Sequence, residues 1–307
     1  MTMTTLSQTP VAQGLGQGKR AVLRRIESRI VDGAIGGVSV VAFLFLYVPI
    51  VALIIFSFDR SPLSSSWTGF TWGWYTTLFH DTFLIGALKV SLIVAVSSAV
   101  VSTVMALMSA VVLSRLAFKG KRAFMAMLFL PLLVPEIVLS VAIITMMSRL
   151  GLSLGYGSLI AGHIVLTLPY GTLLLFGAAT RLDPSLEEAA TDLGCNAFSA
   201  FMRVIFPLLL PAVFASLLLS FTISFTDVVM SNFASGVGTT TLPVYVYGLL
   251  KTGISPEINA LGTLLVVGTL VIVGIIGMRQ LVSIMAGQSG RGKAGPVELA
   301  ELNAESN

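Results

Sequence analysis

The sequence predicts an all-α, polytopic membrane protein with six transmembrane helices and with both termini in the cytoplasm. Of its 307 residues, 55% are apolar and only 10% are charged, whereas a soluble domain carries about 25% charged residues. Its apolar runs reach the roughly 20 residues that cross the hydrocarbon core of a bilayer. Its lysines and arginines gather on alternate connecting segments, a pattern that sets the topology of membrane helices. The six predicted spans cover residues 34–58, 84–113, 123–148, 158–179, 208–233 and 259–284.

The predicted transmembrane domain occupies residues 31–285, with a polar tail at each end. The first span is too long, and follows too many hydrophilic residues, to be a cleaved signal peptide. Residues 1–30 form a basic tail whose first twenty positions are rich in Gly, Gln, Ser and Thr, and residues 286–307 are rich in Gly, Glu, Asn and Ser. Because these tails have few apolar residues to bury, we expect both to be disordered cytoplasmic segments.

The orientation follows from the positions of the basic residues. With the N-terminus inside, the outer segments hold only Arg60, Arg149 and Lys251, while Lys89 lies near the outer end of the second span and can reach the interface. The connection between spans four and five then faces the cytoplasm. The other 14 of the 18 basic residues fall on inner segments: Lys19, Arg20, Arg24, Arg25, Arg29, Arg115, Lys119, Lys121, Arg122, Arg181, Arg203, Arg279, Arg291 and Lys293.

This topology also accounts for the basic pI near 9.4, so we expect no nucleic-acid partner. The single cysteine, Cys195, excludes an internal disulfide and matches no metal-site spacing. With only His80 and His163 present, an HExxH zinc motif is excluded.

The sequence offers no nucleotide-hydrolysing site. Its one resemblance to a phosphate-binding loop is residues 14–20, GLGQGKR, in the polar N-terminal tail. Gln13 stands where that motif requires its first glycine, and Arg20 replaces the Ser or Thr that binds magnesium. We therefore expect a chain that is not an enzyme and that binds no cofactor or metal itself.

Residues 183–207 predict a short polar helix, a glycine turn and a second short helix between two apolar spans. Asp183 and Pro184 form a plausible N-cap and first helical position, and Ser185 with Glu188 gives an alternative capping-box register. Gly194 follows the helix where a left-handed residue would end it.

The second helix of this segment is predicted to begin after Asn196, which can cap it. Its Phe198, Phe201, Met202 and Ile205 provide apolar contacts, and two prolines follow at the entry to span five, where missing amide donors cost least: Pro207 and Pro211. A plain structural interpretation makes the whole segment a connector. An ordered, charged helix-turn-helix between two spans instead favours a docking site for a soluble partner.

The segment resembles the EAA loop of permease subunits of binding-protein-dependent ABC importers, Glu-Ala-Ala-x3-Gly-x9-Ile-x-Leu-Pro. The matching residues are Glu188, Ala189, Ala190, Gly194 and Pro207, with Val204 and Phe206 as apolar replacements for the Ile and Leu. The resemblance extends over residues 34–284. The stretches 72–79 (WGWYTTLF), 238–247 (GTTTLPVYVY) and 253–261 (GISPEINAL) are similar to the second permease subunit of spermidine/putrescine importers.

The resemblance implies a MetI-like permease architecture in the bacterial inner membrane. It implies four kinds of partner: the lipid bilayer, a second permease subunit, two copies of a cytoplasmic ATPase that binds the ATP and Mg²⁺, and a periplasmic or extracellular substrate-binding protein. The loop would be a coupling helix seated in the ATPase, with Glu188 meeting a basic residue there. The residues assigned to ATPase coupling are Glu187, Glu188, Ala189, Ala190, Asp192, Gly194 and Pro207.

Two carboxylates fall inside predicted spans with no basic residue at a matching depth: Glu136 and Asp227. A charge in mid-bilayer costs about 2.5–3.5 kcal/mol or more unless it is paired or hydrated. One hypothesis is that both line a path for a cationic substrate, and the other is that they are protonated or hydrogen-bonded for packing alone. His163, Pro169 and Tyr170 in span four are interpreted as packing and kink residues.

The function that these features predict is that of a permease subunit importing a small solute, with a polyamine as first choice. Aminoethylphosphonate, an opine or a metal chelate are alternatives on the same architecture. A secondary transporter should show inverted internal repeats, and no convincing repeat is present. A membrane scaffold would keep the loop but lack polar residues in its spans.

Overall fold

The computed structural model describes residues 11–61, 67–252 and 256–271. The chain divides into two compact units, one formed by Met1–Trp74 with Asn259–Asn307 and the other by Tyr75–Ile258. Every named element in the described ranges is helical, and the β-bridge found there joins Asp59 and Phe70. The all-α class predicted from the sequence is confirmed.

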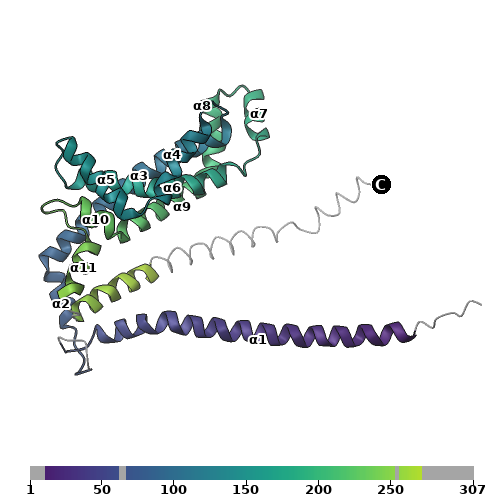
Figure 1. The fold of residues 1–307 in the computed structure, drawn as a ribbon, viewed down its shortest axis with the longest axis horizontal. Coiled ribbons are helices and arrows are strands. Elements are labelled where there is room, and N and C mark those ends of the chain that lie inside the picture. The colour runs from purple at the N-terminus through teal and green to yellow at the C-terminus, as the bar shows by residue number, and fades with distance from the viewer. Residues whose placement is uncertain (1–10, 62–66, 253–255, 272–307) are drawn as a thin grey trace, which may run out of the picture. The chain divides into compact units, whose positions relative to one another are not determined.

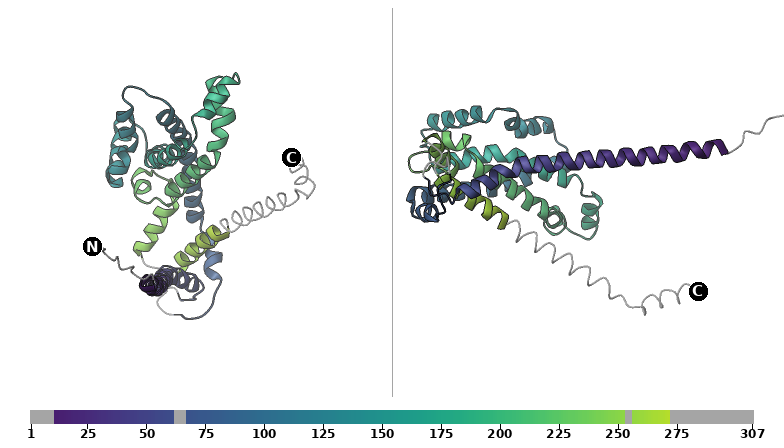
Figure 2. Two further views of the ribbon diagram at one scale, coloured as in Figure 1. Left: turned by 90° about the vertical axis from the view of Figure 1, so that its right-hand side faces the viewer. Right: turned by 90° about the horizontal axis from the view of Figure 1, so that it is seen from below.

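The first unit is built on α1 (Val11–Phe56), which Figures 1 and 2 show as one continuous helix. The tail predicted to be disordered is therefore helical from Val11 onward. Ala, Leu, Arg and Glu between residues 21 and 29 are good helix formers, so nothing in the sequence ends the helix before its apolar part. The rest of that prediction, residues 1–10, lies outside the described residues.

The first unit also contains most of the apolar helix Pro256–Val271, from Asn259 onward. This helix packs closely on α1, because a Cβ added at Gly262 would come within 3.1 Å of Leu53 Cδ1. The predicted span 259–284 is described only to Val271, and the predicted C-terminal tail 286–307 lies outside the described residues.

The segment after α1 contains a buried carboxylate, Asp59, which contacts residues further along the chain. Asp59 Oδ1 accepts hydrogen bonds from the Thr68 N–H at 2.8 Å and the Thr68 hydroxyl at 3.1 Å, and Trp74 Nε1 donates to the Asp59 carbonyl at 2.7 Å. Phe58 stacks on Phe70 with ring centroids 5.3 Å apart. These contacts hold residues 68–74 against Phe58 and Asp59, just beyond the end of α1.

The core of the second unit is the packing of α3 (Thr82–Arg115), α6 (Tyr156–Ala179) and α9 (Phe206–Thr226), which lie side by side in Figure 1. Small residues let these helices approach, as in other membrane bundles. Ala106 and Ala110 of α3 are fully buried against Leu175 of α6. Gly171 of α6 lies so near α9 that a Cβ there would come within 2.7 Å of Ser216 Oγ.

The predicted third span is broken in the structure. It consists of α4 (Lys121–Leu133) and α5 (Glu136–Arg149), which meet at an angle of 109°. Val134 between them is extended, at φ −89° and ψ 130°, because Pro135 disfavours a helical conformation in the residue before it and donates no hydrogen bond. The two prolines predicted a kink, and the structure has a full change of direction.

The predicted fifth span also differs from the structure at both ends. The helix runs from α8 (Ala197–Ala200) through a π-helical turn (Phe201–Ile205) into α9, so it starts well before residue 208. It stops at Thr226, and the chain continues through the short helices α10 (Val229–Ala234) and α11 (Leu242–Thr252).

Within the described residues, four helices are long and apolar enough to cross a membrane, or five if α4 and α5 count as one span. The helix Pro256–Val271 is apolar but shorter in its described part. The count of six spans and the cytoplasmic position of both termini remain predictions.

Candidate functional site

The predicted polar helix is present as α7 (Ser185–Asp192), and the Asp183 side chain binds the first backbone amide of this helix. The Asp183 carboxylate accepts a hydrogen bond from the Ser185 N–H at 2.9 Å, so of the two capping registers it is the Asp183 one that forms. This backbone bond, with a second bond from the Ser185 hydroxyl, lowers the pKa of Asp183. The cap is therefore charged at neutral pH.

The end of α7 is a Schellman turn. Gly194 is left-handed, at φ +84°, its N–H donates to the Thr191 carbonyl at 2.9 Å, and the Cys195 N–H donates to the Ala190 carbonyl at 3.0 Å. Glycine adopts this conformation without strain, and among the other residues Asn and Asp tolerate it best. The next helix, α8, is capped as predicted, because Asn196 Oδ1 accepts from the Ser199 N–H at 2.8 Å.

The turn between α7 and α8 lies at one end of the second unit (Figure 1), and it carries exposed apolar side chains. Leu193 is 86% exposed and Phe198 is 73% exposed, while Phe201 and Ile205 pack inward around Leu209. Exposed large apolar side chains gathered at a turn are typical of an interaction surface. The apolar contacts predicted for the second helix thus divide between the core and this exposed surface.

The residues assigned to coupling fall into two groups. Glu188, Ala189, Asp192 and Gly194 are exposed on this loop, as is Pro207 at the start of α9. Ala190 is buried, and Glu187 is turned back towards α3. Glu187 Oε1 lies 2.9 Å from Arg115 Nε, an intramolecular ion pair that the sequence did not suggest.

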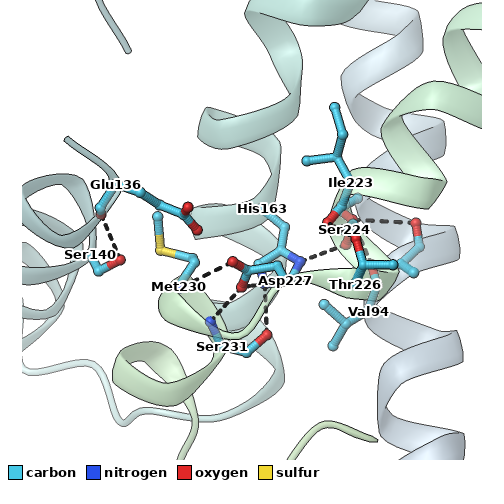
Figure 3. A network of polar contacts seen from close by, with 12 residues as sticks. Val94, Glu136, Ser140, His163, Ile223, Ser224, Thr226, Asp227, Met230 and Ser231 are labelled. Carbon is cyan, nitrogen blue, oxygen red and sulfur yellow. Dashed lines mark hydrogen bonds and ion pairs between the residues drawn. The ribbon is translucent and has the colours of Figure 1, made fainter. Parts of the chain in front are cut away.

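A second candidate site lies where α9 breaks, and it is centred on Asp227 (Figure 3). Asp227 Oδ1 accepts from the Met230 N–H at 3.3 Å and Oδ2 from the Ser231 N–H at 2.7 Å, so the side chain caps α10. The side chain is 5% exposed. The Asp227 carboxylate is therefore buried and accepts hydrogen bonds from two backbone N–H groups.

His163 joins this site and was interpreted from the sequence as a packing residue. The ring is fully buried, with Nε2 at 3.4 Å from Asp227 Oδ2 and 3.2 Å from Ser231 Oγ, and Nδ1 at 2.5 Å from Ser224 Oγ. A neutral ring with its hydrogen on Nε2 satisfies these contacts if Ser224 donates to Nδ1. An ionisable residue inside an apolar span was the available signal for this role.

Glu136 completes the site from the first turn of α5. Figure 3 shows its side chain directed from α5 towards Asp227 and Met230. Its carboxyl group interacts with that of Asp227 and with the Met230 N–H. Glu136 Oε1 is buried without a hydrogen-bond partner in the described structure.

The structure thus brings together the two carboxylates that the sequence singled out. Two neighbouring carboxylates repel each other when both are charged, and a shared proton or a bound positive group relieves this repulsion. No group of three or more His, Cys, Asp or Glu side chains in the described ranges could hold a metal ion.

A bundle of apolar helices with a polar site at its broken helices and an ordered loop at one end is the membrane domain of a transport protein. Residues 102–286 match the family described as binding-protein-dependent transport system inner membrane component. The chain belongs to this family and is a permease subunit of an ABC importer.

Two relatives are close in sequence. The Haemophilus influenzae spermidine/putrescine transport system permease protein PotC is 40% identical over 233 residues, covering 76% of this chain and 91% of that protein. The Escherichia coli putrescine transport system permease protein PotI is 34% identical over 241 residues, covering 76% and 85%. A chain of a bacterial alginate ABC transporter in complex with its alginate-bound periplasmic protein shares the fold, with a TM-score of 0.66 at 20% identity over 82% of this chain and 94% of that one.

Proposed function

We propose that this permease subunit imports a polyamine such as spermidine or putrescine, and that Glu136 and Asp227 line the path of the cation. The observation that carries the proposal is the interaction of the buried Asp227 carboxyl group with that of the half-buried Glu136, whose Oε1 atom has no hydrogen-bond partner in the described structure. Polyamine nitrogens, like the lysine side chain, are protonated at neutral pH. The names of the two relatives support the same substrate class.

The two carboxylates have different parts in this proposal. Asp227 is held by Met230, Ser231 and His163, so it supplies a fixed negative charge. Glu136 keeps free acceptor capacity and therefore supplies the direct contact to an ammonium group. Aminoethylphosphonate, an opine or a metal chelate on the same architecture receives less support, because the two relatives are named for spermidine and putrescine transport.

The energy for import comes, in this proposal, from ATP bound with Mg²⁺ by two copies of a separate cytoplasmic ATPase. The exposed turn at Gly194, with Glu188, Leu193 and Phe198 around it, would dock into that ATPase. The positions of the basic residues support a cytoplasmic location for this turn and a multi-pass position in the inner membrane. A second permease subunit and an external substrate-binding protein would complete the importer.

The test is uptake of labelled spermidine and putrescine by cells that carry the whole importer, with two isosteric variants. Asp227→Asn keeps a capping oxygen but loses the charge, and Glu136→Gln likewise removes only a charge. A hydrogen bond to a charged group contributes about 1.5–3 kcal/mol, so each variant should lower uptake efficiency by about 10- to 100-fold.

Ser140→Ala serves as the matched control, because it removes a buried hydroxyl one turn from Glu136 without changing the charge. This control should keep uptake within a few-fold of the parent chain at equal membrane abundance. Unchanged uptake kinetics in Asp227→Asn and Glu136→Gln would remove these residues from the substrate path.

A further inference from the structure

The ion pair between Arg115 and Glu187 joins two elements that the chain itself does not connect directly. Arg115 is the last residue of α3, and Glu187 lies in the first turn of α7. Their Nε and Oε1 atoms are 2.9 Å apart, and the two side chains are 15% and 38% exposed. Among the described residues this is the one salt bridge between an Arg or Lys and a carboxylate.

Partial burial makes this pair more than a surface contact. Exposed ion pairs contribute little because water screens them, but Arg115 Nη2 is buried and has no hydrogen-bond partner in the described structure. Loss of Glu187 would therefore leave a partly desolvated guanidinium group without its counter-charge. The geometry holds the start of α7 at a fixed place on the end of α3.

The same helix, α3, is joined to the buried polar site. Ser98 Oγ lies 3.0 Å from Ser224 Oγ, Ser224 contacts His163, and His163 contacts Asp227. From Ser98 to Arg115 the helix extends about 25 Å at 1.5 Å per residue. No proline interrupts it, and it packs along α6 and α9. One stiff helix thus contacts α7 at its end and the polar site near its middle.

We propose that Arg115 is a positioning residue that transmits the displacement of α7 into α3, and so to the buried site around Asp227. This inference rests on the proposed docking of the α7–α8 turn in the ATPase. Glu187 then acts inside this chain, and Glu188, which is exposed, remains available to the ATPase. Motion of α7 can also reach α3 indirectly, through α6 and through the π-helical turn and α9, which both pack on α3. The ion pair adds a direct link between α7 and the end of α3.

The experiment uses the complete importer reconstituted in lipid vesicles and measures substrate transported per ATP hydrolysed. Arg115→Gln and Glu187→Gln should each lower this ratio at least about fivefold, the lower end of typical coupling between sites. ATPase binding should be retained. The exchanged pair, Arg115→Glu with Glu187→Arg, should recover much of the ratio. Lys119→Gln, an exposed charge removal nearby, should leave it unchanged.

Arg115→Lys keeps the charge without the planar guanidinium group, so its ratio of substrate transported to ATP hydrolysed should lie between those of the parent chain and Arg115→Gln. It replaces Arg115→Gln in the experiment if that variant does not accumulate in the membrane. A pair that only stabilises the fold would lower protein abundance while the ratio stays constant, and that result would overturn the inference. An exchanged pair no better than the single variants would also overturn it. The proposed function is tested by separate measurements on the parent chain, which are ATPase retention and polyamine uptake. It fails if the parent chain shows neither.

Discussion

Substitution of Gly194 separates the two reasons why a glycine would be required at the turn after α7. Its φ of +84° disfavours most residues with a Cβ, at a cost of about 1–2 kcal/mol for an ordinary L-residue. A Cβ there would meet nothing within 4 Å in this chain. The cost inside the chain is therefore conformational only, and it corresponds to a factor of about 5–30 in the population of the turn.

Three variants distinguish this conformational cost from a steric clash with a docked ATPase. Gly194→Ala adds a small side chain that disfavours the left-handed conformation, whereas Gly194→Asn adds a larger side chain that tolerates it. Gly194→Val adds a larger side chain and also disfavours the left-handed conformation. If the ATPase approaches the turn closely, Gly194→Asn should reduce ATPase co-purification and uptake nearly as much as Gly194→Val, and Gly194→Ala should have the smallest effect.

The assay compares co-purified ATPase and polyamine uptake at equal permease abundance in the membrane. A conformational requirement alone would give the opposite order for Ala and Asn, with Gly194→Asn close to the parent chain. Normal uptake and normal ATPase assembly in Gly194→Val would refute the docking argument altogether.

Two further predictions concern the loops of the second unit. Gly236→Ala should reduce folded protein in the membrane severely, because its Cβ would collide with a backbone carbonyl in the loop between α5 and α6. Thermal unfolding in detergent measures this. Gly238→Ala is the milder control, because its Cβ has open space and its only cost is that of a left-handed backbone at φ +74°, about 1–2 kcal/mol. Tyr245 donates its hydroxyl to Asp81 Oδ2 at 2.7 Å, and burial together with this carboxylate raises the pKa of Tyr245 to about 12. Because the folded-state pKa lies above the ordinary value of about 10, the stabilisation is complete below pH 10 and is lost as the pH rises towards 12. Tyr245→Phe should abolish this alkaline loss, and an unchanged pH dependence of the melting temperature in that variant would contradict the assignment.

Local sequence signals predicted the α7–α8 loop well. Asp183, Gly194 and Asn196 act through bonds to residues a few positions away, so their capping roles could be read from residue type and spacing. Pro135 likewise predicted a kink in the third span. The size of that turn, 109°, depends on what α4 and α5 pack against, which no local pattern records.

The buried site was predicted only in part, because its contacts join distant parts of the chain. Hydropathy continues past Thr226, so the break in α9 was not foreseen, and without it the capping role of Asp227 was hidden. His163 contacts Ser224 and Asp227 across two helices, and its sequence neighbours give no sign of either contact. The pairing of Arg115 with Glu187 was hidden for the same reason.

The central claim is that the turn around Gly194 faces the cytoplasm and is covered by the ATPase. The most direct measurement places a thiol at the exposed Thr191 position (Thr191→Cys), which is not assigned to coupling, after the native thiol is removed (Cys195→Ser), and labels it with a membrane-impermeant maleimide. The account predicts labelling in inside-out vesicles stripped of the ATPase, protection when the ATPase is added back, and no labelling in right-side-out vesicles. Labelling from the outer face, or labelling that is indifferent to the ATPase, would contradict it.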